Sequence, residues 1–415
     1  MITFNDFTLS NGLQVIHHFD ASSRLCVLNV LYKVGSKNEN PEKTGFAHLF
    51  EHLMFGGSKH VPDFDTVLQQ IGGDNNAFTS NDFTNYYITV PSNNIETAFW
   101  IESDRMLALD FNQKSLDVQK SVVIEEFKER YLNQPYGDVW LQLLPLAYKN
   151  HPYQWPTIGK EISHIETATL EDVKDFFYSY YAPNNAVLIL CGNISLEETK
   201  RLSEKWFGDI ETRNVPAYNP VKEPVQLEKR TKHIYSDVPV DLLVMAFPIC
   251  ERVHADFYAI DLLTDILGSG KSSRLYSRLL KERNIFSEID CYHSGDAEAG
   301  LLIIEGKLSL GITLEQAENE VWIVLNDLIK TGIDEQELIK VKNKTETNIR
   351  FNDIGVLNKA MKLAYASYYG NLDLVNTEAD NYLLVTTNQI MMVAKSYLLP
   401  EHSNVLYYHS KNGAR

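Results

Sequence analysis

The sequence predicts an α+β protein of two homologous domains, each a mainly antiparallel β-sheet with helices packed on one face. At 415 residues, the chain is too long for a single compact core. A polar stretch with three prolines, residues 210–232, has no helical or strand period and predicts a linker. The same order of elements occurs on both sides of this stretch. We therefore expect domains at 1–212 and 233–415, joined by a linker at 213–232.

The repeated order of elements is clearest at the end of each half. The segment "TLEDVKDFFYSYYAPNNAVLILCGN", from Thr169, predicts an amphipathic helix, a turn at Pro183 and an apolar strand. Near the C-terminus, "TTNQIMMVAKSYLLPEHSNVLYYHS" has the same order, with Pro400 in the place of Pro183. The starts also correspond, because "LCVLNVLYKVGS" and "VDLLVMAFPIC" are apolar strands that each precede a helical stretch. Two copies of one α+β unit are therefore expected.

Composition excludes several classes of function. The net charge of −17 and the lack of a basic stripe argue against a nucleic-acid partner. No run of eighteen apolar residues occurs, so we expect no membrane-spanning helix. The N-terminal residues resemble no signal peptide, which predicts a cytoplasmic protein, or a periplasmic one whose leader was removed. The four scattered cysteines predict reduced thiols rather than disulfides.

The stretch "HLFEHLMF", which begins at His48, carries the candidate chemistry. Residues 44–57 predict one helix that ends at a glycine pair. Positions three and four apart share a helix face, so His48, Glu51 and His52 lie together. Leu49, Phe50, Leu53 and Met54 fall on the opposite, buried face.

Two imidazoles at positions i and i+4 can chelate one Zn²⁺, while a glutamate on the same face reaches the bound water. The order His-x-x-Glu-His is the inverse of the commoner His-Glu-x-x-His. A short pattern of this kind also occurs by chance, so a third ligand is needed. The helical stretch "SLDVQKSVVIEEFKERY" offers Glu125, Glu126 and Glu129, which point in different directions.

These motifs together resemble the M16 zinc metallopeptidases, whose zinc motif is an inverted HxxEH followed some seventy residues later by Val-Val-Ile-Glu-Glu. Further similar stretches are "GGDNNAFTSNDFTNYYITVP" from Gly72, "HPYQWPTIG" from His151 and "GSGKSSRLYSRLLKERNIFSEI" from Gly268. The resemblance covers most of the chain. It implies the two-domain metallohydrolase fold shared with LuxS and the mitochondrial processing peptidases, with zinc in the first domain and none in the second.

The resemblance also implies the role of each residue. One Zn²⁺ per chain is held by His48, His52 and Glu126, with Glu129 as the alternative ligand. Glu51 is the general base that activates the zinc-bound water. Many members carry a further glutamate seven residues before the third ligand, where this sequence has Gln119. Substrate peptide would pair with an edge strand that contains Asn76, Ala77, Phe78 and Thr79.

The second half departs from the pattern of self-sufficient members. Those members carry an arginine and, seven residues later, a tyrosine that stabilise the oxyanion. Alignment on "SRL" places Leu280 and Ser287 at these positions, and neither side chain can replace the missing donor. The resemblance therefore implies a zinc endopeptidase subunit that cleaves extended or unfolded peptides in a dimeric chamber. We expect a homologous partner subunit to supply the two donors in a heterodimer. A homodimer of this chain is the alternative assembly. The alternative is a non-catalytic structural or assembly subunit.

Overall fold

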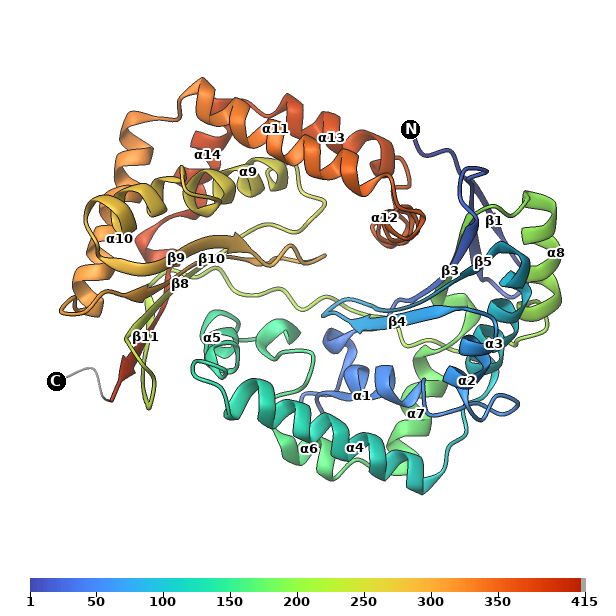
Figure 1. The fold of residues 1–415 in the computed structure, drawn as a ribbon. Helices are drawn as coiled ribbons and strands as arrows, with labels where there is room; N and C mark the ends of the chain where they lie inside the picture. Colours follow the sequence, from blue (N-terminus) through green and yellow to red (C-terminus); the bar gives the residue numbers. More distant parts are fainter. Residues whose placement is uncertain (412–415) are drawn as a thin grey trace. The chain divides into compact units, whose positions relative to one another are not determined.

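The computed structural model describes residues 1–411, which form two compact units (Figure 1). The first unit contains residues 1–130, 155–221 and 350–376. The second unit contains residues 131–154, 222–349 and 377–411. Each unit has its own β-sheet and its own apolar core.

The first unit is built on a six-stranded mixed sheet in the order β1-β2-β6-β3-β5-β4. Only β2 and β6 run parallel, and every other neighbouring pair is antiparallel. The central strands β3 and β6 are apolar and almost wholly buried, as expected for strands covered on both faces. The strands are β1 (Asn5–Thr8), β2 (Gln14–Phe19), β3 (Leu25–Tyr32), β4 (Asp74–Thr79), β5 (Thr84–Pro91) and β6 (Ala186–Gly192).

Helices cover both faces of the first sheet. Figure 1 shows α3 and α8 on one side of the sheet and α12 on the other. The α12 face of the sheet carries Val27, Val187 and Ile189, which pack with Leu363 and Ala364 of α12. The helices of this unit are α1 (Phe46–Leu53), α2 (Phe64–Gln70), α3 (Ile95–Leu107), α4 (Gln113–Phe127), α6 (Ile162–Glu166), α7 (Leu170–Tyr180), α8 (Leu196–Phe207) and α12 (Val356–Tyr368).

The second unit repeats the strand pattern of the first. Its sheet has the order β7-β11-β8-β10-β9, with β7 and β11 parallel and the other pairs antiparallel. This order corresponds, strand for strand, to β2-β6-β3-β5-β4 of the first sheet. Strand β9 is therefore the counterpart of the edge strand β4. The predicted duplication is thus confirmed, including the turns at Pro183 and Pro400 that precede β6 and β11. The strands are β7 (Arg230–Ser236), β8 (Leu242–Pro248), β9 (Phe286–His293), β10 (Leu301–Leu308) and β11 (Asn404–Ser410).

The second sheet is also covered on both faces. Along β8, alternate residues enter different cores: Leu243 and Met245 pack with α9, α10 and α14, whereas Val244 packs with α5. The helices are α5 (Val139–Ala147), α9 (Phe257–Gly268), α10 (Leu314–Thr331) and α14 (Thr387–Tyr397). Helices α11 (Glu335–Asn352) and α13 (Leu374–Leu384) contribute residues to both units. Two π-helical turns, η3 (Lys128–Leu132) and η6 (Tyr276–Glu282), complete the main elements.

The compact units differ from the predicted sequence boundaries in two segments. Residues 131–154, which include α5, join the second unit, and residues 350–376, which include α12, join the first. Both sheets have two apolar faces, and each face needs a cover. The helix that provides the second cover comes from the other half of the sequence in each unit. Residues 211–228 form no helix or strand, and β7 begins at Arg230, slightly before the predicted end of the linker.

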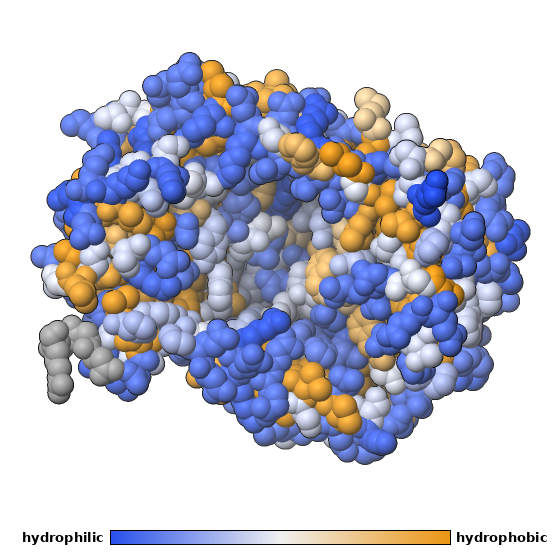
Figure 2. All heavy atoms as spheres, in the orientation of Figure 1, coloured by the Kyte–Doolittle hydropathy of each residue, from blue (hydrophilic) through white to orange (hydrophobic). Residues whose placement is uncertain are grey.

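On the face of the protein that Figure 2 draws, hydrophilic side chains cover most of the surface, and apolar ones occur in small groups. Within residues 1–411, no helix has the length and apolar character needed to cross a membrane. Cytoplasmic location stays a prediction. The four cysteines are free thiols, and three of them are buried, as predicted.

The role of α12 in the first core leads to a test. We expect Leu363→Ala to lower the free energy of unfolding by about 2–5 kcal/mol, because it leaves a cavity against β3 and β6. Leu363 is fully buried, whereas Ile354, just before α12, is 71% exposed. Urea unfolding of Ile354→Ala is the control and should change by less than about 0.5 kcal/mol. Equal effects of the two variants would contradict the packing of α12 on the first sheet.

Candidate metal centre

Helix α1 carries the polar residues His48, Glu51 and His52 on one face, as the sequence predicts. It spans Phe46–Leu53 and is shorter at both ends than the predicted helix over residues 44–57. Leu49, Phe50, Leu53 and Met54 are buried on the other face. The helix does not begin at residue 44, the predicted start, because the backbone at Gly45 is not helical. Its φ of +89° is the left-handed conformation that glycine tolerates. A Cβ there would lie 2.5 Å from the carbonyl oxygen of Ile158, so no other residue fits.

A buried carboxylate caps the N-terminus of α1. Gly45 at the N-cap position has no side chain to accept from the first free N–H groups of the helix. Glu39 takes this role: its carboxylate accepts from the N–H of Gly45 (2.9 Å), the N–H of Ala47 (2.8 Å) and Trp155 Nε1 (3.1 Å). Burial raises the pKa of Glu39 to about 8, although these hydrogen bonds oppose the rise. No sequence pattern identifies Glu39 as the cap, because no spacing rule connects it to the helix.

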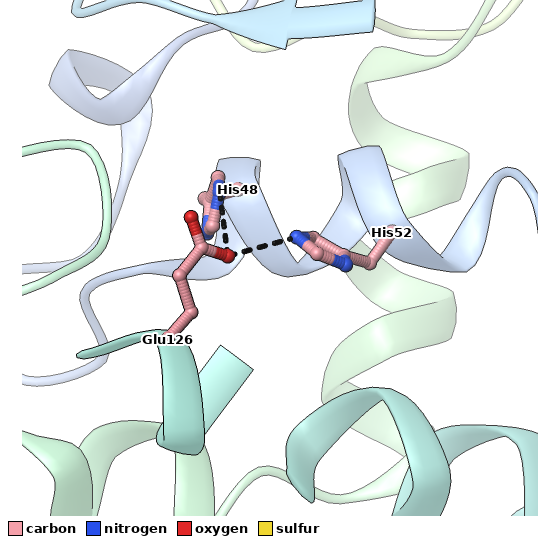
Figure 3. Close-up of side chains that lie close together, drawn as sticks. All are labelled: His48, His52 and Glu126. Carbon is pink, nitrogen blue, oxygen red and sulfur yellow. Dashed lines mark ion pairs between the residues drawn. The ribbon is translucent and has the colours of Figure 1, made fainter. Parts of the chain in front are cut away.

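Glu126 meets the two histidines of α1 from the last turn of α4 (Figure 3). Its Oε2 lies 3.4 Å from His52 Nε2 and 3.7 Å from His48 Nε2. One ligand atom from each of the three residues lies within 4.8 Å of the other two. Two imidazole nitrogens and one carboxylate oxygen suit a zinc ion, which in catalytic sites has three protein ligands and one open position.

The two neighbouring glutamates point elsewhere. The Glu125 side chain is 72% exposed and pairs with Lys128 at 2.7 Å. Glu129 is exposed on the π-helical turn η3. Of the three carboxylates that the sequence offered, the structure therefore brings Glu126 to the histidines.

Burial and charge favour a neutral imidazole at His48 beside an ionised Glu126 carboxylate. Burial lowers the pKa of His48, against the nearby charge of Glu126, which raises it. A hydrogen bond with His52 lowers the pKa of Glu126, and so does the charge of His48. Arg130 adds a positive group, since its Nη2 lies 3.0 Å from Glu126 Oε1, the oxygen that faces away from His52. Neutral histidine and carboxylate are the protonation states that bind a metal ion.

Glu51 lies on the same face of α1 and contacts the edge strand β4. Thr79 Oγ1 donates a hydrogen bond to Glu51 Oε2 at 2.7 Å. Burial raises the pKa of Glu51, and the bond from Thr79 opposes that rise. The predicted strand residues Asn76, Ala77, Phe78 and Thr79 all lie on β4, which pairs only with β5 and is therefore a sheet edge.

The sequence also singled out Gln119, in the first unit, and Leu280 and Ser287, in the second. Gln119 is half-buried on α4, seven residues before Glu126. In the second unit, Leu280 packs against the apolar core. Ser287 is exposed on β9, where its hydroxyl donates to the Lys307 carbonyl at 3.2 Å.

The two arginines near Leu280 are already paired within the second unit. Arg278 forms an ion pair with Asp327 at 2.5 Å, and Arg283 forms one with Glu320. Both acidic partners belong to α10. These contacts give each guanidinium a structural partner.

Comparisons with known proteins show that the chain is similar to members of a peptidase family. Residues 14–161 match the family described as "Insulinase (Peptidase family M16)", and residues 167–345 match "Peptidase M16 inactive domain". The chain is 29% identical to "Zinc protease PqqE" of Helicobacter pylori, over 96% of this chain and 91% of that one. It is 25% identical to "Probable mitochondrial-processing peptidase subunit beta" of Arabidopsis thaliana, over 63% of this chain and 50% of that one.

A solved structure extends the likeness to the whole fold. The crystal structure of a protease from Helicobacter pylori superposes with a TM-score of 0.93 at 28% identity, covering 98% of this chain and 100% of that one.

The cap on α1 gives a testable prediction. We expect Glu39→Gln to lower the free energy of unfolding by about 1–3 kcal/mol, because both carboxylate oxygens accept N–H bonds and the substitution replaces one of them with an NH₂ group, which cannot accept. Thermal and urea unfolding of the variant measure this loss. Glu42→Gln, at an exposed position three residues later, is the control and should match the unmodified chain. A Glu39→Gln variant as stable as its control would show that the carboxylate does not cap the helix.

Proposed function

The chain belongs to peptidase family M16, and from this premise we propose that it is the zinc-dependent catalytic subunit of an endopeptidase. Its substrates would be extended or unfolded peptides. The observation that carries the proposal is the convergence of His48, His52 and Glu126 from two helices within 4.8 Å, with Glu51 on the same helix face. Homologues named as zinc proteases support the same class of activity.

His48, His52 and Glu126 would hold one zinc ion in each chain. When bound, zinc lowers the pKa of a coordinated water and polarises the carbonyl of the scissile bond. Arg130 and Gln119 are the polar residues of this helix region that would orient the Glu126 carboxylate or its surroundings. Arg130 already contacts the Glu126 oxygen that faces away from the histidines.

Glu51 would move the protons of the reaction. It would accept the proton of the attacking water and deliver it to the leaving amine. Burial raises the pKa of Glu51, which strengthens the carboxylate as a proton acceptor. Its position between the two histidines in sequence gives it the same helix face as the proposed ligands.

Strand β4 would bind the peptide backbone by adding it as a further strand at the sheet edge. At present, the N–H of Ala77 donates to the side chain of Asn76 at 2.8 Å. A pairing peptide would replace this local bond with one to its own carbonyl. Such pairing requires an extended substrate, which favours unfolded peptides over folded proteins.

Oxyanion stabilisation would come from a homologous partner subunit. Leu280 and Ser287 occupy the positions of the expected arginine and tyrosine, and the nearby Arg278 and Arg283 are engaged in ion pairs. One relative of this chain is itself named a subunit of a processing peptidase. A heterodimer, in which this chain holds zinc and the partner supplies the two donors, therefore fits the residues best. A homodimer remains the fallback.

Metal analysis combined with a peptide-cleavage assay tests the site. The unmodified chain should hold about one zinc, and Glu126→Gln should hold less than about 0.1 after dialysis, because a ligand is lost. Glu51→Gln should keep its zinc and lose cleavage by about a hundredfold or more. Glu125→Gln, one residue from the proposed ligand but exposed, should keep both zinc and cleavage.

Two outcomes would count against these roles. A Glu51→Gln variant that cleaves normally would reject Glu51 as the base. A chain that holds no zinc and cleaves no peptide, alone or with any homologous partner, would favour the alternative of a non-catalytic assembly subunit.

The partner requirement has its own test. The lone chain should cleave an unfolded, quenched-fluorescence peptide at least about a hundredfold more slowly than the chain mixed with a homologous subunit that carries the arginine and tyrosine. Replacing that arginine in the partner by alanine should remove most of the gain. Full activity of the lone chain would reject the heterodimer.

A further inference from the structure

The side chain of Thr79 points from the edge strand to the proposed base. Thr79 is the last residue of β4, and its hydroxyl donates to Glu51 Oε2 at 2.7 Å. A hydroxyl has one hydrogen to donate, and the other acceptor within reach, the Ala47 carbonyl, is at 3.5 Å. The short bond to the carboxylate is therefore the one that Thr79 makes.

The strand that carries Thr79 is held from its other face. Successive side chains of a strand point to opposite sides, so Phe78 faces away from Glu51. Its ring lies 6.1 Å from that of Phe83 and 6.5 Å from that of Tyr365, which belongs to α12. The end of β4 is thus packed on one face by aromatic rings and hydrogen-bonded on the other to Glu51.

The bond limits how the carboxylate can turn. With Oε2 held by Thr79, the second oxygen, Oε1, is left to accept a proton from a water molecule. A carboxylate without this anchor could rotate about its last torsion, which is broad for glutamate. Misplacement of a catalytic group by about 1 Å can cost a hundredfold in rate.

We propose that Thr79 is a positioning residue that orients Glu51 and links the base to the strand on which the peptide binds. The inference rests on the proposed function. In this arrangement the Thr79 side chain contacts Glu51. The peptide substrate would pair with the backbone of β4. Peptide pairing would stiffen β4, so the orientation of Glu51 would be most constrained when substrate is present. The effect of Thr79 should consequently appear in the chemical step more than in peptide binding.

Two substitutions at Thr79 separate this role from a merely structural one. Thr79→Val keeps the shape and removes the hydroxyl, while Thr79→Ser keeps the hydroxyl. In the zinc-loaded protein, in the assembly that gives full activity, Thr79→Val should lower kcat by about tenfold to a hundredfold with KM within about twofold. Thr79→Ser should restore kcat to within about threefold.

Thr89→Val is the matched control, because Thr89 lies on the neighbouring strand β5, at the opposite end of its pairing with β4. It should change neither kcat nor KM. Zinc content should be equal in all of these variants.

A binding measurement gives a readout that does not depend on turnover. In the Glu51→Gln background, Thr79→Val should leave the Kd of a fluorescent unfolded peptide within about twofold and add no further loss of rate. A Thr79→Val variant with unchanged kcat, with a raised Kd and KM, or with lost zinc would overturn the positioning role alone. Absence of cleavage by the unmodified chain in every assembly would reject the proposed function, and this inference with it.

Discussion

The buried carboxylate of Glu39 caps the N-terminus of helix α1, which carries two of the three residues of the candidate metal centre. Its hydrogen bonds satisfy backbone N–H groups that have no partner within the helix. Gly45 cannot provide a capping side chain, and the left-handed backbone there excludes residues that could. Three hydrogen bonds to Glu39 and the close contact of Gly45 with Ile158 therefore hold the first turn of the helix in place.

The two sheets depend on a different constraint, which is that both of their faces are apolar. In each unit, one face is covered by helices that are mostly close in sequence, and the other by a single helix from the opposite half of the chain. Helix α12 completes the core beneath β3 and β6 and also places Tyr365 against Phe78. The C-terminal half of the sequence thereby supports the strand that contacts Glu51.

Although the two units share their strand order, only the first carries a candidate metal site within residues 1–411. The strands correspond in order, yet α9 has no His-x-x-Glu-His pattern, and the only cluster of three metal-ligating side chains within residues 1–411 is the one in the first unit. The second unit uses its polar residues for its own packing. Arg278 and Arg283, for example, pair with acidic residues of α10. Such a division fits a fold in which only one copy retains the chemistry.

The sequence by itself determined the features that depend on local geometry. Helical spacing placed His48, Glu51 and His52 on one face, and repeated elements indicated two related α+β units. Those patterns predict the structure correctly because a helix or strand has the same period wherever it lies in the fold. The structure decided what depends on contacts between distant residues: Glu126 rather than Glu129 beside the histidines, the Glu39 cap, the Thr79 bond to Glu51, and the exchange of α5 and α12 between units. No spacing rule predicts such contacts, because chain packing alone brings these groups together.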